Sequence, residues 1–159
     1  MNHYLDILFY NESIKVFILS MLPIAELRLS IPYGIFSTNL SICEVVLLSI
    51  SGNILIGLLI IYMVGPMMDF LQSNKYLKSL ILYIFNRTRK RGKIIYRLKF
   101  IGLILFIGIP LPLTGVWTGS LAAYLFGLSK KHTLVAISFG VFISSTIVTT
   151  LTLITKYSL

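Results

Sequence analysis

The sequence is poor in the residue types that build disulfides, metal centres and acid–base active sites. It contains one cysteine, two histidines and five acidic residues in 159. Cys43 alone forms no disulfide within the chain, and no cysteine or histidine has the spacing of a zinc or haem site. No nucleophilic residue has a general base or a metal ligand at the sequence spacing that is typical of an active site. We therefore expect no metal, no cofactor and no enzyme activity.

Charge is also scarce, whereas apolar residues are abundant. Charged residues make up 12% of the chain and hydrophobic residues 57%, with a mean hydropathy of +0.91. These values lie well outside the range of soluble domains. The composition predicts an all-α integral membrane protein with a single membrane domain over residues 1–159.

The net charge of +9 is concentrated in one part of the chain. Nine of the fourteen basic residues lie between two hydrophobic blocks: Lys75, Lys78, Arg87, Arg89, Lys90, Arg91, Lys93, Arg97 and Lys99. The positive-inside rule makes residues 69–99 a cytoplasmic loop beside anionic headgroups, and we expect no nucleic-acid partner. Residues 75–85 have the spacing of an amphipathic interfacial helix. We expect a multi-pass protein of a bacterial-type inner membrane.

Two segments have the length and composition of simple membrane spans. A span needs about 20 apolar residues, and Val45–Met68 and His132–Thr155 each supply them without a charged residue. The first is expected to end at the Gly65-Pro66 breaker. Asn53 within it is expected to face protein or water, either as a helix-packing hydrogen bond or as a ligand contact.

Residues 100–129 are uncharged but do not fit a simple span. As one helix they would be about 45 Å long, with Pro110, Pro112 and Gly115 near the centre. Lys130 and Lys131 follow directly, and a single crossing would place them opposite the basic loop. A re-entrant hairpin with its turn at IPLPLTG, residues 109–115, keeps both groups on the cytoplasmic side.

Residues 16–36 have the same pattern of two apolar arms around a polar centre. That centre is bounded by prolines and contains Pro23, Glu26, Arg28, Pro32 and Gly34. The chain then reads as repeat 1 (residues 16–68), the basic loop (69–99) and repeat 2 (100–155). Each repeat has a re-entrant hairpin and an adjoining transmembrane helix, so the two repeats are inverted, as in secondary transporters. Both termini are predicted outside.

Glu26 and Arg28 are the only charges between Val16 and Cys43. Their i,i+2 spacing suits an unwound turn whose side chains point into one cavity, although an interfacial loop pair near the headgroups is the alternative. Arg28 offers a planar fork of donors for phosphate or carboxylate, and exposed half-helix amides add positive potential. Burial raises and a nearby cation lowers a carboxyl pKa, so Glu26 is the candidate for proton coupling.

The second hairpin contributes further candidate binding residues. Thr114 offers a hydroxyl, and Gly115 and Gly119 allow close approach of a ligand or a helix. Trp117 either caps the cavity, stacks on a ligand or packs in the core.

Two motifs carry a family resemblance. PIAELRLSIPYGI and GIPLPLTGVWTGSLAAYLFGL resemble the small multi-drug export protein family, itself related to the DedA (SNARE-associated, VTT-type) membrane proteins. The resemblance extends from about Leu19 to about Thr150, with Leu29-Ser30 and Leu113 departing from the family's Gly-Ala pair and glycine. It implies two re-entrant hairpins. It also implies roles for Glu26 and Arg28 in the first motif and for the proline and TGxWTG core in the second. DedA-type relatives imply movement of polyprenyl phosphate or other lipids.

Three functions remain open. The first is a proton-coupled transporter or flippase for an amphipathic anion such as a lipid phosphate. The second is a small exporter of cationic drugs, which Arg28 beside Glu26 disfavours. The third is a non-transporting membrane scaffold that acts through its basic loop. The expected partners are membrane lipids and a second copy of the chain, since a homodimer would shield the thin wall of two spans and two hairpins.

Overall fold

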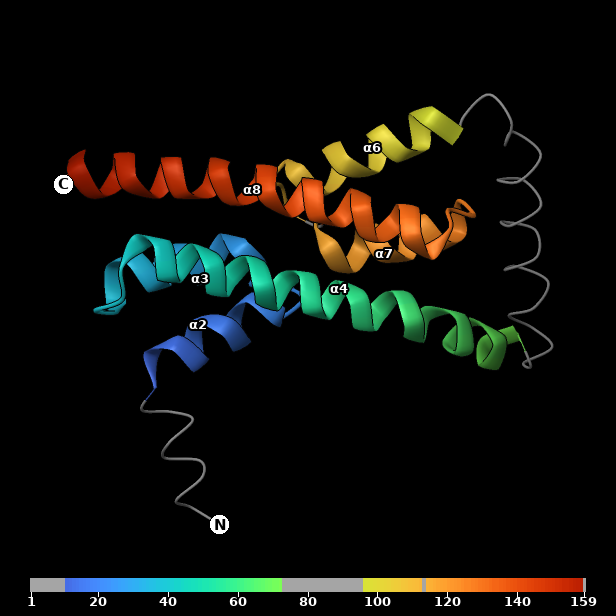
Figure 1. The fold of residues 1–159 in the computed structure, drawn as a ribbon, viewed down its shortest axis with the longest axis horizontal. Helices are drawn as coiled ribbons and strands as arrows, with labels where there is room; N and C mark the ends of the chain where they lie inside the picture. Colours follow the sequence, from blue (N-terminus) through green and yellow to red (C-terminus); the bar gives the residue numbers. More distant parts are fainter. Residues whose placement is uncertain (1–10, 73–95, 113, 159) are drawn as a thin grey trace, which may run out of the picture.

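The computed structural model describes residues 11–72, 96–112 and 114–158, and every element in these ranges is an α-helix. Two short helices followed by one long helix occur twice along the chain (Figure 1). The helices are α2 (Glu12–Met21), α3 (Glu26–Ser37), α4 (Ile42–Gln72), α6 (Tyr96–Gly108), α7 (Val116–Leu125) and α8 (Lys130–Ser158). The predicted all-α class is confirmed for this part of the chain.

The two long helices contain the two predicted spans. Ile42–Pro66 within α4 and Lys130–Ser158 in α8 are 25 and 29 residues long. At about 1.5 Å per residue, both exceed the thickness of a hydrocarbon core. The two helices pack side by side and run in opposite directions (Figure 1). Large apolar side chains such as Met63 on α4 and Phe142 on α8 are more than 60% exposed, as expected for faces that contact lipid.

The predicted helix break at Gly65-Pro66 is wrong, because α4 continues through Pro66 to Gln72. Pro32 likewise lies inside α3. The turn between α2 and α3 is therefore shorter than the polar centre predicted from Pro23 to Gly34. Only residues 22–25 lie outside the two helices. A proline removes one helical N–H and crowds the preceding turn, but in an apolar helix supported by neighbouring helices this does not end the helix. It leaves the carbonyl of Arg28 without its helical donor at Pro32.

The break predicted within residues 109–115 is confirmed, since α6 ends at Gly108 and α7 begins at Val116. Each short pair is held between both long helices. Helix α2 packs on α4 and α6 on α8, while α3 also contacts α8 and α7 also contacts α4. In Figure 1 the turn of each pair points towards the middle of the molecule. The two turns therefore approach each other about halfway along the long helices.

We call the two ends of the molecule in Figure 1 the terminal end and the loop end. The terminal end contains the start of α2, the α3–α4 connection and the last turns of α8; the loop end contains the last turns of α4, the start of α6 and the α7–α8 connection. The predicted interfacial helix and most of the basic cluster fall within residues 73–95, which lie outside the described residues. Leu113 also lies outside the described residues.

Candidate functional site

The two turns have the same local design. Pro23 and Pro112 each stand three residues before a residue with positive φ, Glu26 (φ 45°) and Gly115 (φ 134°). Both positive-φ residues lie where the second short helix of the pair begins. A glycine adopts such a conformation freely, whereas a glutamate there is strained and must be held by its surroundings. Glu26 is therefore the residue whose contacts need explanation.

Glu26 caps a helix from the other half of the chain. Its side chain is buried, and its Oε1 accepts a hydrogen bond of 3.4 Å from the backbone N–H of Trp117, in the first turn of α7. The local cap residue of α7 is Gly115, which has no side chain to offer. A carboxylate at a helix N-terminus satisfies unpaired N–H groups and meets the positive end of the helix dipole. A Cβ at Gly115 would overlap this carboxylate.

Arg28 joins the same two turns. Its Nη2 lies 3.6 Å from Oε2 of Glu26 and also donates to the backbone carbonyl of Thr114. Both residues lie in the first turn of α3, so the predicted unwound segment around them is wrong. They still share one site because the backbone of Glu26 is left-handed and the arginine side chain is long. The guanidinium has further N–H donors, and the side chain is 24% exposed.

Trp117 and Thr114 make structural contacts. The indole Nε1 of Trp117 donates to the carbonyl of Met21, the last residue of α2, at 3.0 Å. The hydroxyl of Thr114 lies 2.9 and 2.8 Å from the carbonyls of Ile109 and Leu111, in its own turn. The hydroxyl predicted as a ligand contact is therefore engaged, and it is the Thr114 carbonyl that faces Arg28. We call Met21, Glu26, Arg28, Thr114 and Trp117 the turn–turn contact.

An open groove of about 400 Å³ adjoins this contact on the side of the terminal end. Arg28 is the charged residue of its lining, and the other lining residues are Pro32, Phe36, Pro110, Val148, Leu151, Thr152 and Thr155. The hydroxyls of Thr152 and Thr155 are bonded to carbonyls of their own helix. The groove thus combines one guanidinium with an otherwise mostly apolar wall.

The remaining predicted site residues lie outside the groove. Pro23 and Pro112 are exposed in the two turns. Gly34 and Gly119 are buried where a Cβ would crowd Val45 and Ile107, so they permit close helix packing. A binding role for these four residues stays a prediction.

Asn53 is a buried polar residue of α4. Its Nδ2 donates to the carbonyl of Ser20 on α2 at 3.0 Å, which is the helix-packing bond that was one of the two predicted readings. Ser30, one of the two residues that depart from the family pattern in the first motif, is buried and bonded to Ser49 at 2.9 Å. Both bonds attach a short helix to α4.

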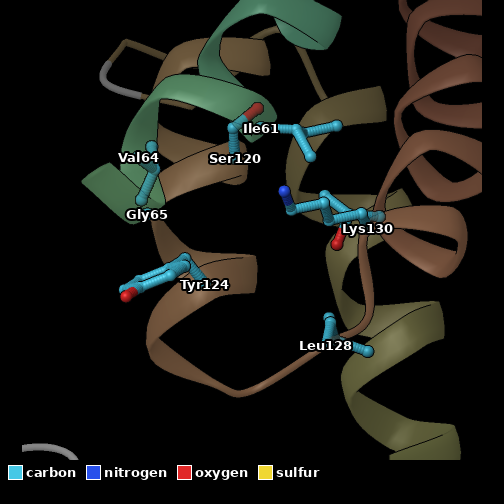
Figure 2. A pocket seen from close by; sticks show the side chains of 8 residues that line it. Ile61, Val64, Gly65, Ser120, Tyr124, Leu128 and Lys130 are labelled. Atoms are coloured by element: carbon cyan, nitrogen blue, oxygen red, sulfur yellow. The ribbon is translucent and has the colours of Figure 1, made fainter. Parts of the chain in front are cut away.

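A second cavity, of about 40 Å³, lies at the loop end (Figure 2). It is lined by Ile61, Val64, Gly65, Ser120, Tyr124, Leu128, Lys130 and Thr133. Sequence reasoning used Lys130 only to orient the chain and did not select Ser120. The sequence gives no local signal for this cavity, because its lining comes from helices that lie far apart along the chain. No group of three or more potential metal ligands occurs within the described ranges.

Comparison with known proteins agrees with the two motifs and the long apolar helices. No curated protein and no solved structure gives a significant match. The family described as "Putative small multi-drug export protein" matches residues 26–147, which include α3, α4, α6, α7 and the first part of α8. This range covers well over half of the chain. The chain is therefore a membrane protein of that family.

Proposed function

We propose that this protein is a membrane transporter or flippase that moves an amphipathic anion, such as a lipid phosphate. The observation that carries the proposal is the groove beside the turn–turn contact. One guanidinium with spare donors stands in it, and the rest of its wall is largely apolar. An anionic headgroup suits Arg28, and an acyl or prenyl chain suits the wall.

The proposed membrane arrangement has two re-entrant pairs that meet at the midplane as inverted repeats. Its support is the doubled order of short, short and long helices, with α4 and α8 antiparallel (Figure 1). Gly52 and Gly140 occupy comparable places, because each brings a long helix against the first short helix of its own half. The proposal includes a relation to DedA-type proteins with a shared architecture, and a cytoplasmic location for residues 69–99.

The geometry suggests how an anion would alter the site. Arg28 is held by the Thr114 carbonyl and the Glu26 carboxylate. A phosphate bound to the guanidinium competes with both partners, because a doubly charged anion is the stronger acceptor. Release of Thr114 loosens the second turn from α3. Glu26 then loses its counter-ion, and proton uptake is the means by which a buried carboxylate is neutralised.

The first prediction tests the clamp. In reconstituted vesicles, Arg28→Gln should lower the rate of translocation of a labelled polyprenyl phosphate or phosphatidic acid at least about tenfold, since a charge-assisted hydrogen bond contributes about 1.5–3 kcal/mol. The double variant Glu26→Gln/Arg28→Gln, which leaves no unpaired charge, should be equally slow. Lys131→Gln, an exposed cation at the start of α8, is the matched control. Wild-type rates equal to those of protein-free vesicles would refute the proposal.

The second prediction tests proton coupling. Glu26→Gln keeps an oxygen acceptor for the Trp117 amide but carries no titrating group. Translocation by this variant should no longer respond to an imposed pH gradient, whereas the wild-type rate should follow it. A gradient response retained by Glu26→Gln would remove Glu26 from the coupling step and leave the anion clamp standing.

The family description favours a second candidate, export of small drugs. A cationic drug would have to pair with Glu26, whose carboxylate is buried and already engaged by Trp117 and Arg28. Arg28→Gln should spare or raise drug tolerance on this candidate and abolish anion transport on ours. A scaffold that acts through the basic loop would instead lose function when residues 87–93 are deleted.

A further inference from the structure

The cavity at the loop end contains a buried hydroxyl that the fold does not use. Ser120 on α7 is 2% exposed, and its Oγ has no hydrogen-bond partner among the described residues. The hydroxyl of Thr133, in the same cavity, is bonded to the carbonyl of Ser129 at 3.0 Å. A buried hydroxyl without a partner is unfavourable and calls for an explanation. A polar ligand in the cavity would satisfy Ser120.

A cation stands at the mouth of the same cavity. Lys130, the first residue of α8, is exposed, and its Nζ lies 4.6 Å from the ring centroid of Tyr62 on α4. Figure 2 shows its nitrogen reaching inward from α8 towards α4 and α7. None of the described residues that line the cavity carries a carboxylate. A hydroxyl donor at depth and an ammonium at the entrance are complementary to an anionic oxygen group.

The cavity and the Arg28 groove are built from corresponding helices. The groove lies between α3 and the second half of α8, and the cavity lies between α7 and the second half of α4, with the start of α8. The groove adjoins the terminal end, and the cavity adjoins the loop end. Their volumes differ about tenfold, from about 400 to about 40 Å³. The smaller has room for about three water molecules.

We infer that Ser120 and Lys130 form a second binding station for a phosphate-like anion, at the loop end of the molecule. The inference rests on the proposed function, because the station is where the anion held by Arg28 would be received or collected. The present conformation is then open at the Arg28 groove and nearly closed at the Ser120 cavity. Separation of α7 from α4 would enlarge the cavity.

The test uses the full chain in phosphatidylcholine nanodiscs, with Arg28→Gln as the background so that the groove's guanidinium does not contribute. The measurement is equilibrium binding of dihexanoyl phosphatidic acid. Adding Ser120→Ala or Lys130→Gln should weaken binding about tenfold, the effect of one lost hydrogen bond to a charged group. Thr149→Val is the matched control, because the buried Thr149 hydroxyl also has no partner within the ranges that the structure describes but lies outside the cavity.

Ser120→Ala removes no hydrogen bond within the described structure, so its thermal midpoint should equal that of the control. Equal binding by the Ser120→Ala and Thr149→Val variants, or no binding by the Arg28→Gln background, would overturn the inference. Competition by inorganic phosphate would support a station for free phosphate, and competition by phosphatidic acid alone would support a lipid headgroup. Binding that depends on Ser120 without any translocation by the wild type would refute the proposed function but not the station.

Discussion

At the scale of single residues, Glu26 determines how the two halves of the chain meet. It has a strained backbone and a buried charge, and its carboxylate faces amides 91 positions further along the chain. Each feature is unfavourable alone. Together they are stable because the carboxylate supplies the cap that Gly115 cannot, and because Arg28 supplies the counter-charge.

The third prediction concerns Gly115. A side chain here would meet the Glu26 carboxylate and would also have to adopt a φ of 134°. Gly115→Ala should therefore destabilise the protein by about 2–3 kcal/mol and lower its thermal midpoint in detergent.

Two further glycine variants distinguish overlap with the Glu26 carboxylate from the backbone strain of a positive φ. Gly127 also has a positive φ (71°), but no atom of the described residues lies within 4 Å of a Cβ built there, so Gly127→Ala should show backbone strain alone. Gly102 lies in α6 with no atom of the described part of the chain near its Cβ position, so Gly102→Ala should be neutral or slightly stabilising. A Gly115→Ala variant no less stable than Gly127→Ala would mean that the carboxylate does not occupy this position.

Glu26, Arg28, Gly115 and Trp117 could be selected from the sequence, because charges and prolines in long apolar runs are conspicuous. The residues that they contact could not be predicted from the sequence. The capping of α7 by Glu26 depends on how two distant turns pack, and no local pattern encodes that contact. The sequence analysis expected exposed half-helix amides to add positive potential beside Arg28, whereas the Trp117 amide in the first turn of α7 is already bonded to the Glu26 carboxylate.

At the scale of elements, lysines secure the C-terminal ends of the second short helices. Lys156 on α8 donates to the carbonyl of Ile35 in the last turn of α3, at 3.1 Å, and Lys99 on α6 donates to the carbonyl of Phe126 at the end of α7, also at 3.1 Å. A cation at a helix C-terminus satisfies unpaired carbonyls and opposes the negative end of the dipole.

The fourth prediction removes one of these contacts. Lys156→Met keeps the apolar stem but loses the ammonium, so the free energy of unfolding should fall by about 1 kcal/mol. Denaturation in mixed detergent micelles measures it. Lys131→Met, at the other end of α8, should change stability far less, and an equal loss in both variants would show only a general effect of charge.

The long helices and the break at residues 109–115 were predictable because length, hydropathy and clustered prolines act locally. The effects of Pro32 and Pro66 were not, because whether a proline ends a helix depends on the support of neighbouring helices. The prolines and glycines therefore predicted the position of the second turn correctly, but they predicted a first turn that is longer than the one in the structure.

At the scale of the whole molecule, the fifth prediction tests topology with cysteines in a Cys43→Ser background. Asn39→Cys, in the α3–α4 connection, and Phe126→Cys, after α7, should react with an impermeant maleimide from opposite sides of the membrane. Ile24→Cys, 87% exposed in the first turn, should react from neither side, because it would face lipid at the midplane. Labelling of Ile24→Cys from the side opposite to Asn39→Cys would mean that α2 and α3 each cross the bilayer.

Because the Trp117 indole is bonded to the Met21 carbonyl, its intrinsic fluorescence reports on the contact between the two halves of the chain. The chain has one tryptophan, and that residue bridges the two halves at their point of contact. Its emission therefore arises from a single environment, without a label and without a background from other indoles. A red shift on addition of substrate would record wetting of the indole as the halves part, and stopped-flow fluorescence would time each opening.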